Sequence, residues 1–392
     1  MSTKSVDVVV VGAGVYVTGR GTSGYGTILP ALFEGRRRGM VGRITLSATS
    51  QQSLAEARTR AQALSRLMRV DGSLETVVAP VDPTALESHD ACLAGIVSVP
   101  DSLHADVAVP LLESGVSCLV VKPFAPTLAE ARRMCRAAAQ SGVYGAVDFH
   151  KRWDAANIRL RDELRAGRLG VPLYAVIEFS QKKQVPLVHF RKWVNNTNVF
   201  QYLGAHYVDL LWFVTGYKPE AVSACGQRVY LEDQGIDTED AIQVMIRWQT
   251  PDGIPFVSTL LVNWIDPDRS SAMSDQRMLV VGTEGRYDSD QKYRGVQIVT
   301  DQEGVADVNP YFTSLAHDSE LDALRCVGYG PDSILTFIQD VAELRAGRRT
   351  LSELEPLRPT FTSALVSTAV IEAVAESLKR QGAWVSVALP MA

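Results

Sequence analysis

The sequence predicts an α/β domain with a doubly wound parallel sheet over residues 1–150, followed by an α+β domain with a large, mostly antiparallel open sheet over residues 151–392. The length alone allows two hydrophobic cores, because domains usually contain about 100 to 200 residues. In the first part, short apolar strands alternate with helical segments, as they do in parallel sheets. In the second part, apolar and polar residues alternate along several strands, which is typical of an antiparallel sheet with one covered face.

The elements of the first domain follow one another in β-α-β order. Strands are expected over residues 8–11, 43–48, 76–81, 90–99 and 116–121. Helices are expected to begin near residues 24–27, 53 and 105 and to end near residues 33, 67 and 114. This alternation is what a doubly wound sheet requires, because each crossover between parallel strands needs a helix.

A helix over residues 155–166 is expected to lead into the second domain. Its strands are expected over residues 172–180, 221–229, 240–248, 255–263, 277–282 and 295–300, all in one broad sheet. Further helices are expected over residues 200–215, 332–344 and 359–380.

A valine-rich strand followed by six glycines opens the chain and reads DVVVVGAGVYVTGRGTSGYGTILP from Asp7 to Pro30. Glycine allows a tight turn and lets the backbone approach a bulky anion closely. The NH groups at the start of the next helix attract phosphate. The combination predicts a Rossmann-type loop that binds the pyrophosphate of a dinucleotide; the alternative is a flexible surface loop.

The glycine spacing departs from the G-x-G-x-x-G pattern, because Val17 stands where the third glycine belongs. We interpret Tyr16–Ser23 as an insertion that lengthens the phosphate loop. Its arginine and threonine are suited to hydrogen bonds with phosphate oxygens. The residues expected to contact the dinucleotide here are Gly12, Gly14, Tyr16, Gly19, Arg20 and Thr22.

The end of the second strand is where such domains distinguish NAD from NADP. An acidic residue there binds the ribose 2′-hydroxyl of NAD. This chain instead has Thr49 and Ser50, which do not repel a 2′-phosphate, and the next arginine is Arg58. The sequence therefore leaves both cofactors open, with a small preference for NADP.

Composition and charge exclude several classes of protein. The net charge of −5 offers no basic surface for nucleic acid, and 46% hydrophobic residues is ordinary for a globular protein. No apolar run reaches the length of a membrane helix, and the N-terminus leads directly into a strand. The five cysteines form no C-x-x-C pair. We expect a cytoplasmic protein without disulfides or a bound metal, and without a nucleic-acid or membrane partner.

Two short motifs follow the fourth and fifth strands, at the edge where doubly wound sheets bind ligands. One is Pro100–His104, PDSLH, and the other is Lys122-Pro123. In a mostly apolar pocket near a nicotinamide, the Lys122 ammonium would hydrogen-bond a reacting hydroxyl and favour loss of its proton. The alternative is a solvated lysine at the end of a strand.

These motifs resemble the Gfo/Idh/MocA oxidoreductase family, whose members carry Pro-Asn-x-x-His and, one helix and strand later, Glu-Lys-Pro. Val121 replaces the family's glutamate. The resemblance implies that Lys122 is the catalytic lysine and also contacts substrate. It further implies that Pro100, His104, Lys122 and Pro123 lie beside the cofactor.

The segment Val147–Trp153, VDFHKRW, is similar to the family's crossover strand, which ends in two arginines. Arg152 matches one of them and Lys151 replaces the other. The resemblance implies that Arg152 helps to bind substrate.

The helix over residues 200–215 carries the second part of the resemblance, because it matches the family's Asp-x-Gly-x-His-x-x-Asp through Gly204, His206 and Asp209. Tyr202 stands where the family has aspartate, one turn before His206, so both would face the substrate. Histidine has a suitable ordinary pKa to accept a hydroxyl proton, whereas a phenol is a different participant in a proton relay. We expect His206 and Tyr202 to act in catalysis and substrate binding, and Asp209 to be a structural acceptor.

The alternative for His206 is a satisfied core histidine. Gly204 argues against this, because a glycine inside a helix costs about 1 kcal/mol relative to alanine and marks a close approach.

The loop over residues 181–197, QKKQVPLVHFRKWVNNT, mixes cations, aromatic rings and asparagines as carbohydrate-binding surfaces do. We expect Trp193 to stack on a sugar and Asn195 to hydrogen-bond its hydroxyls. An ordinary connection and a subunit contact are equally good alternatives.

The favoured interpretation is an NAD(P)-dependent oxidoreductase that transfers a hydride between a secondary hydroxyl of a sugar, inositol or glycoside and the nicotinamide. Lys122 would polarise the oxygen and His206 would relay the proton. One alternative is an enzyme with tightly bound NAD(P) that uses transient oxidation for sugar elimination or epimerisation. Another is a non-catalytic nucleotide-bound sensor. The resemblance also implies a homodimer or homotetramer.

Overall fold

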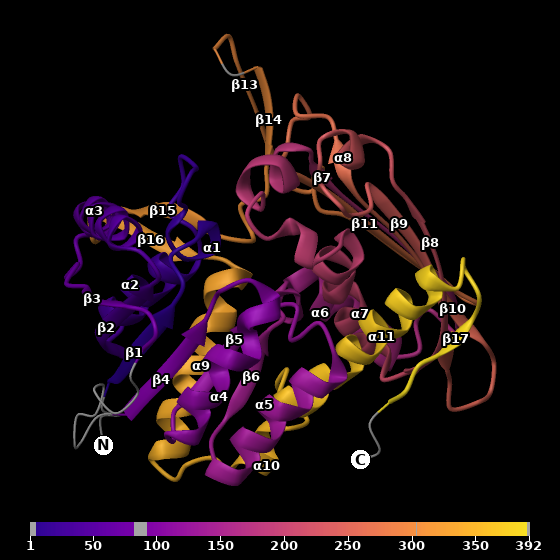
Figure 1. Ribbon diagram of the computed structural model, residues 1–392, viewed down its shortest axis with the longest axis horizontal. Helices are drawn as coiled ribbons and strands as arrows, with labels where there is room; N and C mark the ends of the chain where they lie inside the picture. The colour runs from indigo at the N-terminus through magenta and orange to yellow at the C-terminus, as the bar shows by residue number, and fades with distance from the viewer. Residues whose placement is uncertain (1–4, 82–91, 303, 390–392) are drawn as a thin grey trace. The chain divides into compact units, whose positions relative to one another are not determined.

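The chain folds into two compact units in a computed structural model that describes residues 5–81, 92–302 and 304–389 (Figure 1). The first unit comprises Met1–Ala125, Ala129–Trp153 and Tyr311–Ala364. The second comprises Pro126–Leu128, Asp154–Pro310 and Leu365–Ala392. Residues 311–364 thus belong with the N-terminal part of the chain. The predicted boundary between residues 150 and 151 stays a prediction.

The first unit contains a six-stranded parallel sheet of order β3-β2-β1-β4-β5-β6, as the sequence predicts. Its strands are β1 (Val6–Val11), β2 (Val41–Ala48), β3 (Glu75–Val78), β4 (Cys92–Val97), β5 (Ser117–Val121) and β6 (Gly145–Asp148). Residues 90 and 91, where the fourth strand was expected to start, lie outside the described residues. The order reverses between β1 and β4, so the carboxyl ends of these strands flank the crevice where doubly wound sheets bind ligands.

The helices of this unit are α1 (Val15–Thr18), α2 (Ile28–Arg37), α3 (Gln51–Met68), α4 (His104–Glu113), α5 (Leu128–Ser141), α9 (Tyr329–Arg345) and α10 (Leu351–Leu354). A two-stranded hairpin, β15 (Ser314–Asp318) and β16 (Ala323–Val327), precedes α9.

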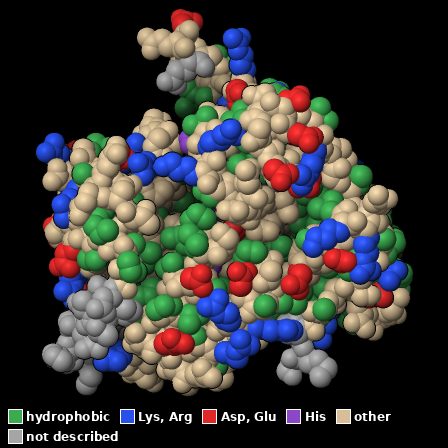
Figure 2. All heavy atoms as spheres, in the orientation of Figure 1, with side chains coloured by type: hydrophobic (Ala, Val, Ile, Leu, Met, Phe, Trp, Pro, Cys, Tyr) green, Lys and Arg blue, Asp and Glu red, His purple; other side chains and the backbone are tan. Residues whose placement is uncertain are grey.

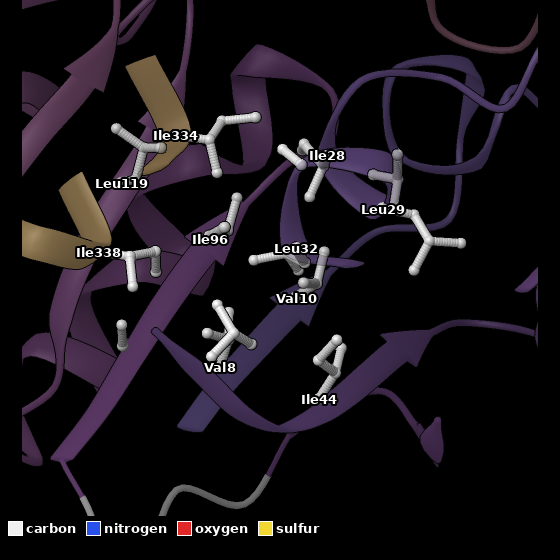
Figure 3. Close-up of a cluster of buried hydrophobic side chains, with 14 of the residues drawn as sticks. Val8, Val10, Ile28, Leu29, Leu32, Ile44, Ile96, Leu119, Ile334 and Ile338 are labelled. Atoms are coloured by element: carbon white, nitrogen blue, oxygen red, sulfur yellow. The ribbon is translucent and has the colours of Figure 1, made fainter. Parts of the chain in front are cut away.

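The core of the first unit joins the start of the chain to a helix more than 300 residues later. Val8 and Val10 of β1 are buried against Leu32 of α2 and against Ile334 and Ile338 of α9 (Figure 3). Burying each such side chain contributes about 1.5 to 3 kcal/mol. Helix α9 therefore stabilises the sheet that carries the predicted cofactor loop.

The second unit contains a seven-stranded sheet of order β12-β11-β7-β10-β9-β8-β17, in which only the β7–β10 pair is parallel. Its strands are β7 (Pro172–Lys182), β8 (Lys218–Gln227), β9 (Ala241–Gln249), β10 (Phe256–Asp266), β11 (Ser274–Gly282), β12 (Arg286–Asp290) and β17 (Val385–Ser386). Its helices are α6 (Ala155–Arg165), α7 (Ala205–Thr215), α8 (Tyr230–Asp233) and α11 (Phe361–Lys379).

One face of this sheet is covered by helices. Tyr207 of α7 makes an edge contact with the ring of Phe179 on β7, and Ser377 of α11 accepts a hydrogen bond from the Ala224 NH on β8. Buried residues alternate with partly or fully exposed ones along β9 and with partly exposed ones along β10. The predicted mostly antiparallel sheet with one covered face is confirmed.

The prediction that residues 295–300 join this sheet is wrong. They form β13 (Val296–Thr300), which among the described strands pairs only with β14 (Gly304–Val308), in a separate hairpin that projects from the second unit (Figure 1). All five residues of β13 are exposed. The apolar residues of this segment identify a strand but do not identify its partner.

Among the described helices, only α11 is long and apolar enough to cross a membrane by length and composition. Its most apolar window is 67% buried inside the protein, as in the core helix of a soluble protein. On the face drawn in Figure 2, Lys and Arg side chains are interspersed with Asp and Glu.

Candidate active site

The strand-to-helix turn after β1 has the geometry of a phosphate loop. Gly12 has φ +117°, and a Cβ there would lie 1.9 Å from the carbonyl oxygen of Ser98, so only glycine fits. Gly14 caps the N-terminus of α1, and no described atom lies within 4 Å of the position a Cβ would take. The backbone is thus accessible at Gly14, where the pyrophosphate of a dinucleotide needs a close approach. The short helix α1 begins here at Val15, nine to twelve residues before the helix start that the sequence predicted.

The insertion after α1 folds upon itself. Gly19 has φ +71°, and a Cβ there would lie 2.0 Å from the Gly24 carbonyl oxygen. The Thr22 hydroxyl donates to the Gly19 carbonyl, 2.7 Å away. Arg60 of α3 donates to the carbonyls of Thr22 and Gly24 at 2.8 and 2.7 Å. Gly19 and Thr22, predicted to contact cofactor, therefore hold the shape of this loop through these contacts.

Arg20 reaches from the insertion to the first turns of α3. Its guanidinium donates to the Ser53 hydroxyl at 2.6 Å and pairs with Glu56 at 2.8 Å. The Ser53 hydroxyl lies 2.8 Å from that of Ser50, which caps α3. Thr49 and Ser50 are both exposed, as predicted cofactor contacts should be. The structure thus places the Arg20 guanidinium, paired with Glu56, next to the two serines at the start of α3.

Lys122 lies directly after β5, at the carboxyl edge of the parallel sheet, and is partly exposed. Burial is the main cause that lowers its pKa, to about 7, and Lys151 lowers it further. Asp101 and Asp148 oppose this shift. Near neutral pH the side chain therefore exchanges readily between ammonium and amine, which a group that assists proton transfer requires.

Asp148 ends β6 beside Val121 and is 1% exposed. It accepts hydrogen bonds from the hydroxyls of Tyr16, 2.6 Å away, and Ser333, 2.7 Å away. The His150 Nδ1 lies 3.8 Å from the same carboxylate. Burial alone would raise the pKa of Asp148, but His150 and the two hydroxyls lower it, while burial lowers the pKa of His150. Asp148 is thus a buried anion beside the lysine.

The sequence interpretation missed Asp148, His150 and Ser333. An acidic residue at the end of an apolar strand was the available signal for Asp148. Tyr16 was predicted to contact cofactor; the structure shows in addition that its hydroxyl connects the phosphate loop to the carboxyl end of β6.

We expect Asp148→Asn to lower the pKa of Lys122 below about 7, because the substitution removes a negative charge that opposes the shift. The measurement is the pH dependence of the ¹³C NMR signal of reductively methylated Lys122, assigned with Lys122→Met. Ser333→Ala removes one hydrogen bond to Asp148 but no charge, so it should shift the titration less. An unchanged titration in Asp148→Asn would show that the carboxylate does not act on Lys122.

His104 is 1% exposed and connects two backbone segments of the site. Its Nδ1 lies 3.1 Å from the Phe124 carbonyl oxygen and its Nε2 lies 3.0 Å from that of Val99. Burial lowers its pKa, while Asp101 opposes that shift. The observed contacts of His104 therefore hold the loop of Lys122 against the end of β4.

The other predicted residues of the first unit also lie at this edge. Pro100 and Pro123 border the segments that His104 joins, and Pro123 is buried. Lys151 and Arg152 lie in a 3₁₀ turn, His150–Trp153, after β6 and are both buried.

In the second unit, the predicted catalytic helix begins with a π-helical turn, Phe200–Gly204, that continues into α7. A Cβ on Gly204 would lie 2.5 Å from the Phe200 ring, which confirms the expected close approach. His206 and Asp209 are buried. Tyr202 is partly exposed and packs against Trp193, with ring centroids 6.2 Å apart.

Asn195, predicted to bind substrate, is exposed and accepts a hydrogen bond from the Asp237 NH at 3.2 Å. Trp193 and Tyr202 are thus neighbours, while Asn195 is held by the segment before β9. Among the described residues, no three His, Cys, Asp or Glu side chains form a group that could hold a metal ion.

Comparisons with known proteins agree with this organisation. Residues 6–149 match a family model described as "Oxidoreductase family, NAD-binding Rossmann fold", and residues 158–288 match the "GFO/IDH/MocA C-terminal domain". The chain is 25% identical to scyllo-inositol 2-dehydrogenase (NAD(+)) of Bacillus subtilis, over 68% of this chain and 76% of the relative. It is 23% identical to the scyllo-inositol 2-dehydrogenase (NADP(+)) of the same organism, over 73% and 76%.

A solved structure with a similar fold is scyllo-inositol dehydrogenase from Lactobacillus casei with bound NAD(H) and scyllo-inositol. It has a TM-score of 0.70 and 14% identity, over 98% of this chain and all of the other.

Proposed function

The chain belongs to the GFO/IDH/MocA family of NAD-binding oxidoreductases, and we propose that it transfers a hydride between a secondary hydroxyl of a sugar, inositol or glycoside and the nicotinamide of NAD(P). The observation that carries this proposal is the position of Lys122 at the carboxyl edge of the parallel sheet, directly after Val121, which pairs with Asp148; burial there lowers the pKa of Lys122 to about 7. The relatives named for inositol dehydrogenation support a polyhydroxylated substrate.

The residues around Gly14 fit a dinucleotide. Gly12 permits the turn, Gly14 leaves space at the start of α1, and the Tyr16 hydroxyl fixes that helix to Asp148. These residues would hold the pyrophosphate, and Thr49 and Ser50 would face the adenosine ribose. When bound, the nicotinamide supplies the hydride acceptor or donor.

In this proposal, the Lys122 side chain hydrogen-bonds the oxygen of the reacting hydroxyl. As the carbon loses hydride, that oxygen must lose its proton to become a carbonyl. Lys122 stabilises the developing negative charge on the oxygen, and Asp101 and Asp148 keep part of the lysine protonated by opposing the effect of burial. His206 accepts the proton, and the Tyr202 hydroxyl, one turn earlier on the same helix, takes part in its relay or packs beside it.

A panel of polyols and sugars tests the proposal. Each compound is offered with NAD⁺ and with NADP⁺, and turnover is followed by the absorbance of the reduced nicotinamide. Turnover of a secondary hydroxyl compound supports the proposal. A chain that binds the dinucleotide but oxidises none of them, with no reduction of the corresponding ketones, would contradict it.

We predict that NADP binds at least as well as NAD, because no acid stands at position 49 or 50, and because the Arg20 guanidinium, although paired with Glu56, hydrogen-bonds Ser53 next to Ser50. Ser50→Asp should shift the preference toward NAD by about tenfold or more, since the carboxylate repels a 2′-phosphate and accepts from a 2′-hydroxyl. Aspartate also caps helices well, so the fold is preserved.

Dissociation constants for both cofactors measure the shift. Gln62→Asp, an exposed position later on α3, is the matched control for charge and should leave the ratio unchanged. Strong NAD selectivity in the parent protein would contradict this assignment of the end of β2.

A further inference from the structure

Four aromatic side chains gather in the second unit, and we call them the aromatic platform: Phe190, Trp193, Tyr202 and Trp264. The Phe190 ring centroid lies 4.4 Å from that of Trp193 and 4.8 Å from that of Tyr202. The ring centroid of Trp264, on β10, lies 6.0 Å from that of Tyr202. Trp264 is fully buried, whereas the other three side chains are partly exposed. The platform is therefore a surface of rings supported by the sheet.

Two π-helical turns position these rings. One, Val185–His189, ends at Phe190, and the other, Phe200–Gly204, contains Tyr202. Such turns form well under 1% of protein structure and occur frequently at functional sites. Two of them bringing rings into one cluster favour a binding role over an ordinary connection.

The platform continues onto the helix of the proposed proton acceptor. Tyr202 lies one turn before His206, so its ring and the imidazole project from the same side of the helix. Under the proposed function, this is the side that meets the reacting carbon, and the inference below rests on that function.

The platform offers few acceptors for sugar hydroxyls. An aspartate at position 202 would accept several hydrogen bonds, whereas tyrosine presents a ring and a single hydroxyl. Phe190 has no polar side-chain atom, and the indole NH of Trp264 is donated to Gln181 at 3.2 Å. A ligand on this surface gains mainly C–H and ring contacts.

The charge of the surrounding loop selects against one class of ligand. Aromatic clusters also bind ammonium groups. The loop over residues 181–197, however, carries four Lys and Arg residues and no acid. Lys183 already lies 4.2 Å from the ring centroid of Tyr230. These cations disfavour an amino sugar and favour a neutral ligand.

We propose that the aromatic platform binds the apolar face of a neutral glycoside, including an aryl or alkyl substituent. The chain then acts on substituted sugars in preference to free polyols such as the inositols.

Matched substrates test this proposal: phenyl and methyl glucopyranosides, with scyllo- and myo-inositol as free polyols. We expect kcat/KM to be about tenfold higher for the phenyl than for the methyl glycoside, because one ring contact contributes about 0.5 to 1.5 kcal/mol beyond its buried area. Phe190→Ala should reduce this ratio to about twofold, mainly through KM. Tyr293→Ala, a 70% exposed ring outside the platform, should leave it unchanged.

The reverse change is Tyr202→Asp, which restores the family's acid. It should lower kcat/KM for the phenyl glycoside and raise kcat/KM for the free inositols, so that the substrate preference reverses. Quenching of tryptophan fluorescence by the phenyl glycoside provides a binding readout that needs no turnover, and Trp193→Phe should diminish it.

The outcomes separate the two proposals. If no hydroxyl compound is oxidised but the phenyl glycoside still quenches fluorescence in a Phe190-dependent way, the platform binds apolar glycosides and the proposed reaction is wrong. If polyols are oxidised with no phenyl preference and no effect of Phe190→Ala, the platform proposal is wrong. A Phe190→Ala variant that changes only the mass measured by light scattering would assign the platform to a subunit contact.

Discussion

Replacing Lys122 by methionine should lower turnover by about 10²- to 10³-fold, because the oxygen that loses its proton would lose its principal charge-stabilising partner. Cofactor binding should remain nearly intact, since the lysine contacts the reacting oxygen more than the dinucleotide. The measurements are single-turnover rates for a substrate found in the panel and dissociation constants for NAD⁺ and NADP⁺.

Stability gives a check against misfolding. The folded-state pKa of Lys122, about 7, lies below its ordinary value of 10.5. The unfolded chain therefore holds this proton more tightly, so the protein gains stability from the group as pH rises between these values and carries a costly ammonium below pH 7. Lys122→Met should thus be at least as stable as the parent in acid, by thermal unfolding.

Lys122→Arg separates the two possible roles of the lysine. Arginine keeps the positive charge but does not release its proton in proteins. If Lys122 only stabilises charge, this variant retains more activity than Lys122→Met. If Lys122 also accepts the proton, both variants lose activity to the same extent. Ordinary turnover in Lys122→Met would remove the lysine from the mechanism.

The pattern of apolar residues along the sequence predicted the strands of the parallel sheet. Val8–Val11 is apolar on both faces, as the strands of a covered parallel sheet are. The strand assignments also placed Lys122 and Pro100 at the carboxyl edge of the sheet, because each residue comes directly after a predicted strand. The same reasoning failed for residues 295–300, since an exposed hairpin and a sheet strand share one pattern.

Long-range partners were not predictable from one sequence. Ser333 hydrogen-bonds Asp148 across 185 residues, and Ile334 and Ile338 of α9 lie in the core of the first unit. Arg20 was predicted to contact the cofactor, and its contact with Ser53 depends on how the insertion folds around Gly19. The aromatic platform depends on two π-helical turns, which no simple periodicity indicates.

His206→Ala should lower the oxidation rate by about 10²- to 10⁴-fold, the usual contribution of a general base. In the parent, the rate should rise with pH through the ionisation of the imidazole, because only the neutral ring accepts a proton. That rise alone does not identify His206, since the pKa of Lys122 is about 7, in the pH range where histidines ordinarily ionise. The His206→Ala variant identifies the base, because removal of the imidazole flattens the profile of kcat against pH if His206 accepts the proton.

Tyr202→Phe then separates a relay from a packing role. A large loss means that the phenol carries the proton onward from His206, whereas a rate within about tenfold of the parent means that the ring only packs against the ligand. His317→Ala, an exposed histidine in β15, is the control and should change neither rate nor profile. If His206→Ala keeps both its rate and its pH dependence, the proton leaves by another route, and Lys122 becomes the base because its neutral amine is already populated near pH 7.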